Sequence, residues 1–159
     1  CGAADVRGTP RRVVGELMNP DVVALHPEMT VPEAQELLAR RSVSGAPVVD
    51  ATGRILGVVS QNDLVRSSAH PDTAGEKGMF FTSDEDLADL AATPVPPSAT
   101  AVREVMTRRV YHVSRDTGVA VAANIMRERR IHRLLVTDRG VLVGVVTSLD
   151  LLRVVEELC

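Results

Sequence analysis

The sequence contains one short pattern twice, and this repetition limits the folds that the chain can adopt. The later copy, from Gly144 to Leu151, reads Gly-Val-Val-Thr-Ser-Leu-Asp-Leu, and the earlier copy, from Gly57 to Leu64, reads Gly-Val-Val-Ser-Gln-Asn-Asp-Leu. In both copies an apolar run typical of a buried strand ends at the hydroxyl residue, and a helix-like run follows at once. We therefore expect two similar folding units that carry the same functional motif.

The repetition extends well beyond this pattern. Aligning residues 14–66 with residues 102–153, and leaving Thr52 unmatched, pairs 52 positions, of which 16 are identical. A repeat of this length indicates an internal duplication of one supersecondary unit. We refer to residues 14–66 as the first repeat and to residues 102–153 as the core of the second repeat.

Each repeat reads as strand, helix, strand, strand, helix. Thr30 and Glu33 form a capping-box pattern at the start of the first helix. The strand runs are continuously apolar, which is typical of sheets covered on both faces. The expected fold class is therefore α/β (α+β), with two βαββα units. The expected elements span 22–25, 30–41, 46–50, 55–59 and 61–68 in the first repeat, and 110–113, 118–130, 134–138, 141–146 and 148–158 in the second.

The expected domain organisation has four parts. Residues 1–13 read as an N-terminal arm, 14–69 as the first unit, 70–101 as a linker and 102–159 as the second unit. Ser83 followed by an acidic turn predicts a short helix over 83–90 in the linker. Residues 51–54 predict a hairpin turn between two strands.

Composition excludes several classes of protein. The chain has 159 residues, a net charge of −3 and two cysteines, Cys1 and Cys159. A slightly acidic chain without basic grooves is not expected to bind nucleic acid. No apolar run approaches the ~20 residues that a membrane span needs. The cysteines form no disulfide framework, so we expect a cytoplasmic protein.

The repeated (Ser/Thr)-x-x-Asp pattern has two interpretations. A hydroxyl followed three residues later by an acid is a common helix-capping signal. The same groups at a strand-to-helix junction also suit a ligand, because the first N–H groups of a helix favour an anion. A carboxylate one turn later can accept hydrogen bonds from two adjacent ribose hydroxyls. Both interpretations remain open from these residues alone.

The duplicated unit that closes with this motif resembles the CBS (cystathionine-beta-synthase-type) domain, and two such domains form a Bateman module. The resemblance covers about residues 13–156. It implies two units packed about a pseudo-twofold axis, with AMP, ADP, ATP or S-adenosylmethionine as a regulatory ligand bound between them. No other cofactor is implied.

The resemblance also implies the site residues. Asp63 and Asp150 would hold ribose, and Ser60 and Thr147 would contact phosphate or ribose. His132 and Arg133 match phosphate contacts in the second repeat, whereas Ser44 and Gly45 stand there in the first, so we expect two unequal sites. The residues implied for the base pocket are Val59, Val146, Asn19 to Ala24, Val43 and Ser44.

Several expectations concern what the chain does not do and what it contacts. No activated nucleophile pair or metal-ligand spacing is present, so neither an enzyme nor a metal site is expected. The alternative to nucleotide binding is a ligand-free structural or protein-interaction module, and a redox-responsive regulator that uses Cys1 and Cys159 is a third. A homodimer is expected through apolar residues of the closing helices, although these could equally belong to the core: Leu64, Val65, Leu151, Leu152, Val155 and Leu158.

Overall fold

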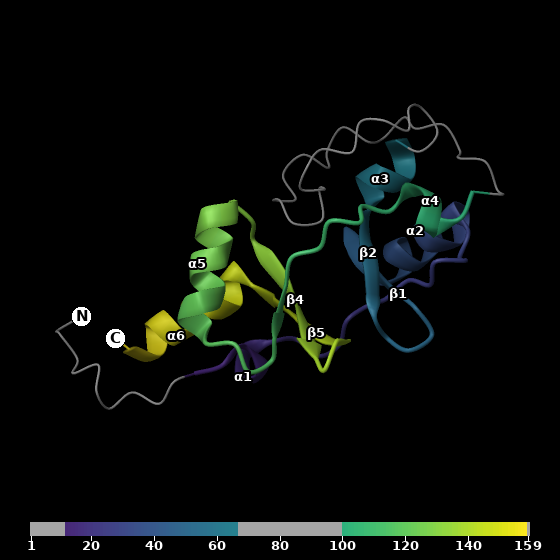
Figure 1. Ribbon diagram of the computed structural model, residues 1–159. Coiled ribbons are helices and arrows are strands. Elements are labelled where there is room, and N and C mark those ends of the chain that lie inside the picture. Colours follow the sequence, from purple (N-terminus) through teal and green to yellow (C-terminus); the bar gives the residue numbers. More distant parts are fainter. Residues whose placement is uncertain (1–11, 67–99, 159) are drawn as a thin grey trace.

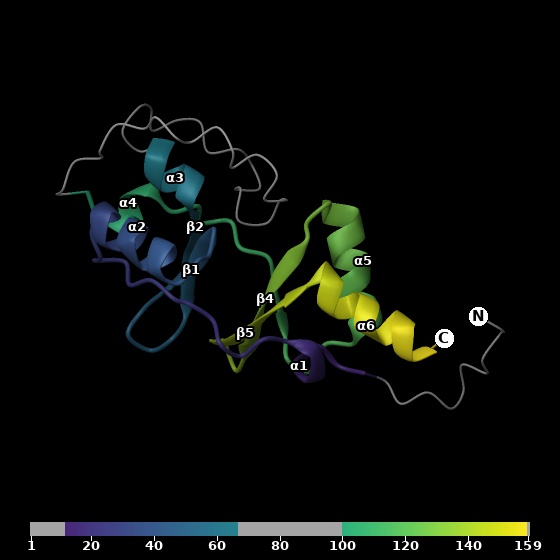
Figure 2. The ribbon, with the colours of Figure 1, turned by 180° about the vertical axis from the view of Figure 1, so that it is seen from behind.

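The computed structural model describes residues 12–66 and 100–158 (Figure 1). The linker helix expected over 83–90, both cysteines and most of the expected N-terminal arm lie outside these residues. Within them the chain forms two lobes that lie side by side in both views (Figures 1 and 2). We call the lobe built mainly from the first repeat the first lobe and the other the second lobe.

The first lobe contains a two-stranded antiparallel sheet. Strand β1 (Gly45–Val49) pairs with β2 (Ile55–Ser60), preceded by helix α2 (Val31–Arg40) and followed by α3 (Gln61–Arg66). The second lobe repeats this order with α5 (Val119–Arg129), β4 (Arg133–Asp138), β5 (Val141–Thr147) and α6 (Ser148–Leu158). Strand β3 (His112–Ser114) joins its sheet parallel to β4, which gives the order β3-β4-β5. The mixed α/β (α+β) fold class is confirmed.

The strand expected over 22–25 is wrong as a continuous element. Only Leu25 forms a bridge there, parallel to Val48. Local turns occupy the N–H groups upstream, since Asp21 N–H donates to Asn19 Oδ1 and Val22 N–H donates to the Pro20 carbonyl. Side chains and turns of this kind compete with a sheet ladder for backbone donors. In the second repeat, where a strand was expected over 110–113, strand β3 covers His112–Ser114 instead.

The expected capping box at the start of α2 is confirmed. Glu33 N–H donates to Thr30 Oγ1 at 3.3 Å, and Thr30 N–H donates to Glu33 Oε2 at 3.1 Å. These two bonds satisfy donors that the first helical turn leaves unpaired. The helix then buries Val31, Ala34 and Leu38 against the first-lobe sheet.

The two repeats exchange their first helices. Helix α1 (Val14–Leu17) begins the first repeat, yet its Val14 N–H donates to the Thr117 carbonyl of the second lobe. Helix α4 (Val102–Val105) begins the second repeat, yet its Val102 N–H donates to the Met29 carbonyl of the first lobe. Figure 1 shows the purple α1 below the green and yellow elements and the green α4 beside the blue ones.

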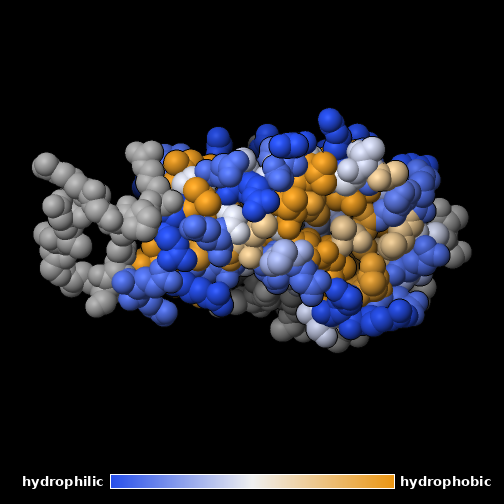
Figure 3. All heavy atoms as spheres, turned by 90° about the horizontal axis from the view of Figure 1, so that it is seen from below, coloured by the Kyte–Doolittle hydropathy of each residue, from blue (hydrophilic) through white to orange (hydrophobic). Residues whose placement is uncertain are grey.

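The exchange is also visible in the cores. Val14 and Leu17 belong to the hydrophobic cluster of the second lobe, while Val102 belongs to that of the first. Val14 and Val102 are both 0% exposed. On the face seen from below in Figure 3, apolar atoms gather in central areas bordered by hydrophilic residues. Each lobe therefore depends on the other repeat for part of its core.

The sequence left open whether the apolar residues of the closing helices belong to the core or to the surface, and they divide between the two, with Val65 half-buried. Leu64 and Leu151 are buried and therefore serve the cores. Leu152 and Val155 of α6 are exposed. The side chain of Leu158 lies outside the described part. Among the described residues, no helix is both long and apolar enough to cross a bilayer.

The hairpin turn of the first lobe contacts the hairpin of the second. The Gly53 carbonyl accepts a hydrogen bond of 3.0 Å from Leu142 N–H. Asp50 organises the turn, since its Oδ1 accepts from the Thr52 hydroxyl at 2.6 Å and from Arg54 N–H at 3.1 Å. These bonds, that from the Thr52 hydroxyl above all, lower the pKa of Asp50 below its ordinary value of 3.8.

Asp50 is therefore expected to give the fold a measurable pH dependence. A carboxyl whose pKa is lowered by folding stabilises the folded state above its unfolded pKa, and this contribution is lost as the pH falls through the folded pKa. The stability difference between the wild type and Asp50→Asn should shrink as the pH falls below 3.8. Urea unfolding at a series of pH values tests this, and a difference independent of pH would contradict it.

Candidate functional site

The first copy of the motif lies where β2 ends and α3 begins. Ser60 N–H donates to Asp63 Oδ2 at 2.9 Å, and Asp63 N–H donates to Ser60 Oγ at 3.1 Å. Ser60 is buried and Asp63 is half-buried. The two side chains therefore form a reciprocal helix cap, which is the structural interpretation that the sequence allowed.

The second copy has the same geometry where β5 ends and α6 begins. Thr147 N–H donates to Asp150 Oδ2 at 2.9 Å, and Asp150 N–H donates to Thr147 Oγ1 at 3.3 Å. The Thr147 hydroxyl also lies 3.0 Å from the same carboxylate oxygen. The two copies of the motif therefore share one local geometry, in which a half-buried carboxylate is held by its own helix cap.

The exchanged segments run directly beside these motifs. After α1, Asn19 N–H donates to the Val145 carbonyl at 2.8 Å and Val145 N–H donates back at 3.0 Å. After α4, Thr107 and Val58 form the same pair of bonds, at 2.8 and 2.9 Å. Asn19 is therefore paired two positions from Thr147 along β5, and its role in a base pocket stays a prediction.

The repeated glycines make this approach possible. A Cβ built on Gly57 would lie 2.7 Å from the Thr107 carbonyl oxygen, and one on Gly144 would lie 2.6 Å from the Met18 sulfur. Real Cβ atoms do not come so close to their neighbours. The crossing backbone thus requires glycine at position 57, whereas at position 144 the nearest contact is the flexible side chain of Met18.

The structure brings His132 and Arg133 together with the second motif. The His132 carbonyl accepts from Ser148 N–H at 2.9 Å, and Arg133 is paired with Thr147 across β4 and β5. The His132 side chain is exposed and that of Arg133 is half-buried. A cationic guanidinium and an imidazole therefore flank the start of α6.

The first repeat has no such charge at the equivalent position. The Ser44 carbonyl accepts from Gln61 N–H at 2.8 Å, and Gly45 pairs with Ser60. The Val43 carbonyl accepts from Gln61 Nε2 at 3.2 Å. These bonds place Val43 and Ser44 beside the first motif, and their role in a pocket for the second motif stays a prediction.

Three other predicted pocket residues differ in exposure. Val59 and Val146 are 0% exposed, each inside the core of its lobe. In this arrangement neither residue is accessible to a base. Ala24 is exposed and directly precedes the Leu25 bridge to β1. Whether these three residues contact a ligand remains a prediction.

Thr107 is a candidate site residue that the motif search did not find. It is 8% exposed, and its Oγ1 has no hydrogen-bond partner in the described part of the chain. Buried hydroxyls are normally paired. The signal was present in the repeat, because the alignment matches Thr107 with Asn19. Among described side chains, no three His, Cys, Asp or Glu residues gather as metal ligands.

Comparison with known proteins identifies the family. The CBS domain model matches residues 14–70 and 102–157. The chain is 33% identical over 147 residues to the CBS domain-containing protein CBSX1 of Arabidopsis thaliana, which covers 88% of this chain and 62% of CBSX1. The protein therefore belongs to the CBS domain family, with two domains in tandem.

Two solved structures share this architecture and carry ligands. CBSX2 in complex with AMP matches with a TM-score of 0.65 and 27% identity, covering 92% of this chain and 97% of that one. The cytosolic domain of the Mg²⁺ channel MgtE in complex with ATP matches with a TM-score of 0.66 and 30% identity, covering 91% of this chain and 49% of that one. The chain spans less than two thirds of CBSX1 and about half of the MgtE chain.

Proposed function

We propose that this chain is a non-enzymatic regulatory module that binds an adenosine-containing nucleotide at its two Asp motifs. The observation that carries the proposal is the repeated junction at which a capped carboxylate, a hydroxyl and an exchanged segment of the other repeat meet. The AMP complex of CBSX2 and the ATP complex of MgtE support it, because both share this fold at 27–30% identity.

The chemistry of the junction suits a nucleoside. Asp63 and Asp150 accept from their own caps through Oδ2, and a carboxylate offers two oxygens with about four acceptor positions. It can therefore cap its helix and also accept from a ribose diol. The hydroxyl of Thr107, which has no hydrogen-bond partner among the described residues, adds a polar group to the first junction that a bound ligand would satisfy.

The two sites are proposed to differ in phosphate preference. Arg133 supplies a planar guanidinium with several donors, which binds phosphate in a fixed geometry. His132 lies next to it, whereas the first junction has Ser44 and Gly45 at these positions. A polyphosphate such as ATP is therefore assigned to the second junction, and the uncharged part of the ligand dominates binding at the first.

Regulation follows from the position of these sites between the repeats. A ligand can shift a conformational or assembly equilibrium only by the difference in its affinity for the two states. Because Asn19 and Thr107 reach the junctions from the other repeat, a ligand held at either junction contacts both repeats. Its binding energy would then depend on how the lobes are arranged.

The capping bonds favour a second candidate, a structural or protein-interaction module whose Asp motifs only stabilise helices. Both carboxylates are fully explained as caps without any ligand. The two candidates differ in the expected effect of removing the carboxylate charge: it should weaken nucleotide binding under the first candidate and leave it unchanged under the second. A redox role for Cys1 and Cys159 concerns residues outside the described part.

The decisive variant is Asp150→Asn. Its amide oxygen can still accept from Thr147 N–H, so the unfolding temperature without ligand should stay close to that of the wild type. The charge needed for strong bonds to ribose is lost, and charge-assisted hydrogen bonds contribute about 1.5–3 kcal/mol. We expect the affinity at the second junction to fall about tenfold or more, measured by isothermal titration calorimetry with AMP and ATP.

The matched control is Asp138→Asn, at the opposite end of β4 from the motif. It should leave nucleotide affinity unchanged. If Asp150→Asn bound nucleotide as tightly as the wild type, Asp150 would be a cap alone. If the wild type bound none of AMP, ADP, ATP and S-adenosylmethionine, the second candidate would replace the first.

A further inference from the structure

The second Asp motif lies at an end of its sheet that two arginines reach. Strand β5 ends at Thr147, which is paired with Arg133 at the start of β4. Strand β3 runs parallel to β4, and Leu135 N–H donates to the Tyr111 carbonyl at 3.1 Å. Arg109 precedes Tyr111 by two residues, just as Arg133 precedes Leu135. Because parallel strands run in one direction, the chain at Arg109 arrives at the same end of the sheet as Arg133.

Arg109 lies on a segment that both lobes hold. Two residues upstream, Thr107 and Val58 of β2 form a pair of backbone hydrogen bonds in the first lobe. Three residues downstream, β3 begins at His112 in the sheet of the second lobe. The side chain of Arg109 is exposed. An anion bound by Arg109 and Arg133 would therefore contact the segment that joins the two lobes.

The first repeat carries the opposite charge at this position. The repeat alignment matches Arg109 with Asp21 and Arg129 with Arg41. In the first lobe Asp21 Oδ1 lies 3.4 Å from Arg41 Nη2, so an ion pair joins the segment to the end of α2. Both segments then enter their sheets through parallel pairings at aligned positions. In the second lobe, two arginines therefore stand where the first lobe has an ion pair.

The described part of the chain does not balance this extra charge. Neither Arg109 nor Arg129 forms an ion pair with a described residue. The negative end of the α5 dipole explains a cation at Arg129, but Arg109 does not belong to that helix. Like charges that lie close together repel each other. A bound anion would offset this repulsion, as the Asp21 carboxylate does for Arg41 in the first lobe.

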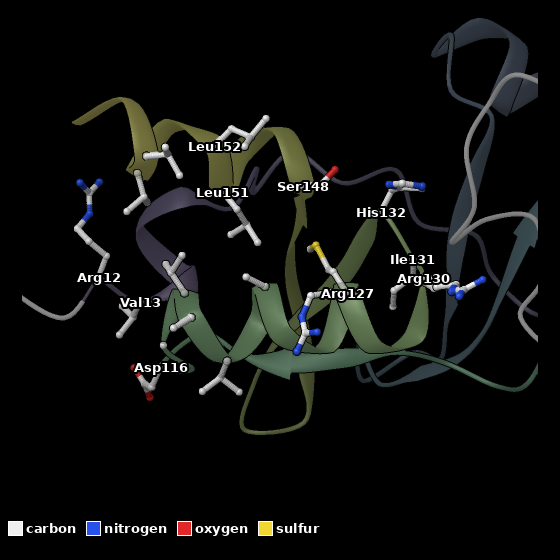
Figure 4. A pocket seen from close by; sticks show the side chains of 18 residues that line it. Arg12, Val13, Asp116, Arg127, Arg130, Ile131, His132, Ser148, Leu151 and Leu152 are labelled. Carbon is white, nitrogen blue, oxygen red and sulfur yellow. The ribbon is translucent and has the colours of Figure 1, made fainter. Parts of the chain in front are cut away.

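A pocket between α5 and α6 connects another arginine to the second Asp motif. Arg130, His132 and Ser148 all line it, and Ser148 is the first residue of α6. Figure 4 shows Arg130 and His132 on the side of this pocket away from Asp116. Four arginines, which we call the arginine cluster, thus belong to the same end of the second lobe: Arg109, Arg129, Arg130 and Arg133.

We propose that Arg109 and Arg129 bind the outer phosphates of a nucleoside triphosphate at the second junction, which makes this junction selective for a triphosphate over a monophosphate. The inference rests on the proposed nucleotide function and names the residues that distinguish phosphate chains of different length. Arg133 lies next to the motif and serves the phosphate nearest the ribose, whereas a longer chain carries negative charge outward to the rest of the arginine cluster. Guanidinium groups suit this role, because they bind phosphate oxygens through paired hydrogen bonds.

The test titrates AMP and ATP by isothermal titration calorimetry into a chain that carries Asp63→Asn, so that binding is measured at the second junction. ATP should bind about tenfold or more tightly than AMP. Arg109→Asp introduces the acid of the first repeat, and it should lower the ATP affinity about tenfold or more while the AMP affinity changes less than about threefold. The control Arg139→Asp makes the same charge change at the turn between β4 and β5 and should leave both affinities unchanged.

The reciprocal variant tests the first junction. Asp21→Arg removes the ion pair with Arg41 and places two arginines there, so the ATP affinity should rise in a chain that carries Asp150→Asn, while the AMP affinity changes less. Asp21 and Arg109 are both exposed, so the unfolding temperatures without ligand should stay close to that of the wild type.

The possible outcomes separate this inference from the proposed function. Equal affinities for AMP and ATP at the second junction would overturn the inference and leave nucleotide binding intact. An Arg109→Asp variant that binds ATP as before, or that loses AMP and ATP by the same factor, would overturn it as well. A wild type that binds neither nucleotide would overturn the proposed function, and the inference with it.

Discussion

Replacing Gly57 by alanine is expected to lower the free energy of unfolding by about 2–3 kcal/mol, as overpacking of a tight site does. The new Cβ would lie 2.7 Å from the Thr107 carbonyl oxygen and 2.9 Å from the Met106 sulfur. The carbonyl belongs to backbone that already accepts a hydrogen bond from Val58 N–H, so it cannot move without loss of that bond. Urea unfolding of the variant measures the effect.

Two other glycines provide the comparison. At Gly144 the nearest atom is the mobile Met18 sulfur at 2.6 Å, so Gly144→Ala should cost less than Gly57→Ala. At Gly118 no atom lies within 4 Å of the built Cβ, and Gly118→Ala should change stability by less than about 0.5 kcal/mol. If all three substitutions changed the free energy of unfolding equally, the effect would come from the lost flexibility of the chain and not from the contact with the crossing backbone.

Replacing Val14 by aspartate is expected to have a still larger effect, about 3–5 kcal/mol, the range for an uncompensated buried charge. Val14 is 0% exposed and packs in the second lobe although it belongs to the first repeat. Most of the stability of a domain this size would be lost. Thermal unfolding followed by circular dichroism should show a large decrease or a chain that no longer folds.

The milder variant Val14→Ala locates the damage. A buried valine truncated to alanine should cost roughly 2 kcal/mol, which leaves a folded chain for hydrogen exchange. Protection from hydrogen exchange should fall first in β4 and β5, because these strands belong to the second lobe, in which α1 packs. The mirror variant Val102→Ala should instead weaken β1 and β2. Damage confined to the repeat that contains the substitution would contradict the exchange of helices.

The sequence predicted those elements whose signals are local. Helix α2 has its capping box and apolar spacing within ten residues, and the strand runs of β4 and β5 are bounded by a turn at Gly140. The closing helices were predicted from the same motif that suggested function. These elements can be predicted because the hydrogen bonds of caps and turns join residues that are only a few positions apart in the sequence.

Features that depend on distant contacts were not predicted. Helices α1 and α4 have four residues each, too few for a periodic pattern, and their positions depend on bonds to the other repeat. Leu64, Leu151 and Leu152 all stand at the end of the repeated motif, and the sequence does not distinguish them. Only the finished fold shows that Leu64 and Leu151 are buried and that Leu152 is exposed. The sequence similarly indicated the Asp motifs but not Thr107, whose hydroxyl matters only once α4 has crossed to the first lobe.

The exchange of α1 and α4 means that neither repeat holds a complete core of its own. If the chain were cut between residues 66 and 100, each fragment would keep its sheet and two longer helices but lose the short helix, α4 or α1, that completes its core. The fragments would have to associate in order to fold. The tandem chain thus resembles a two-chain complex with swapped segments in which a covalent connection has replaced association, so that folding no longer depends on protein concentration.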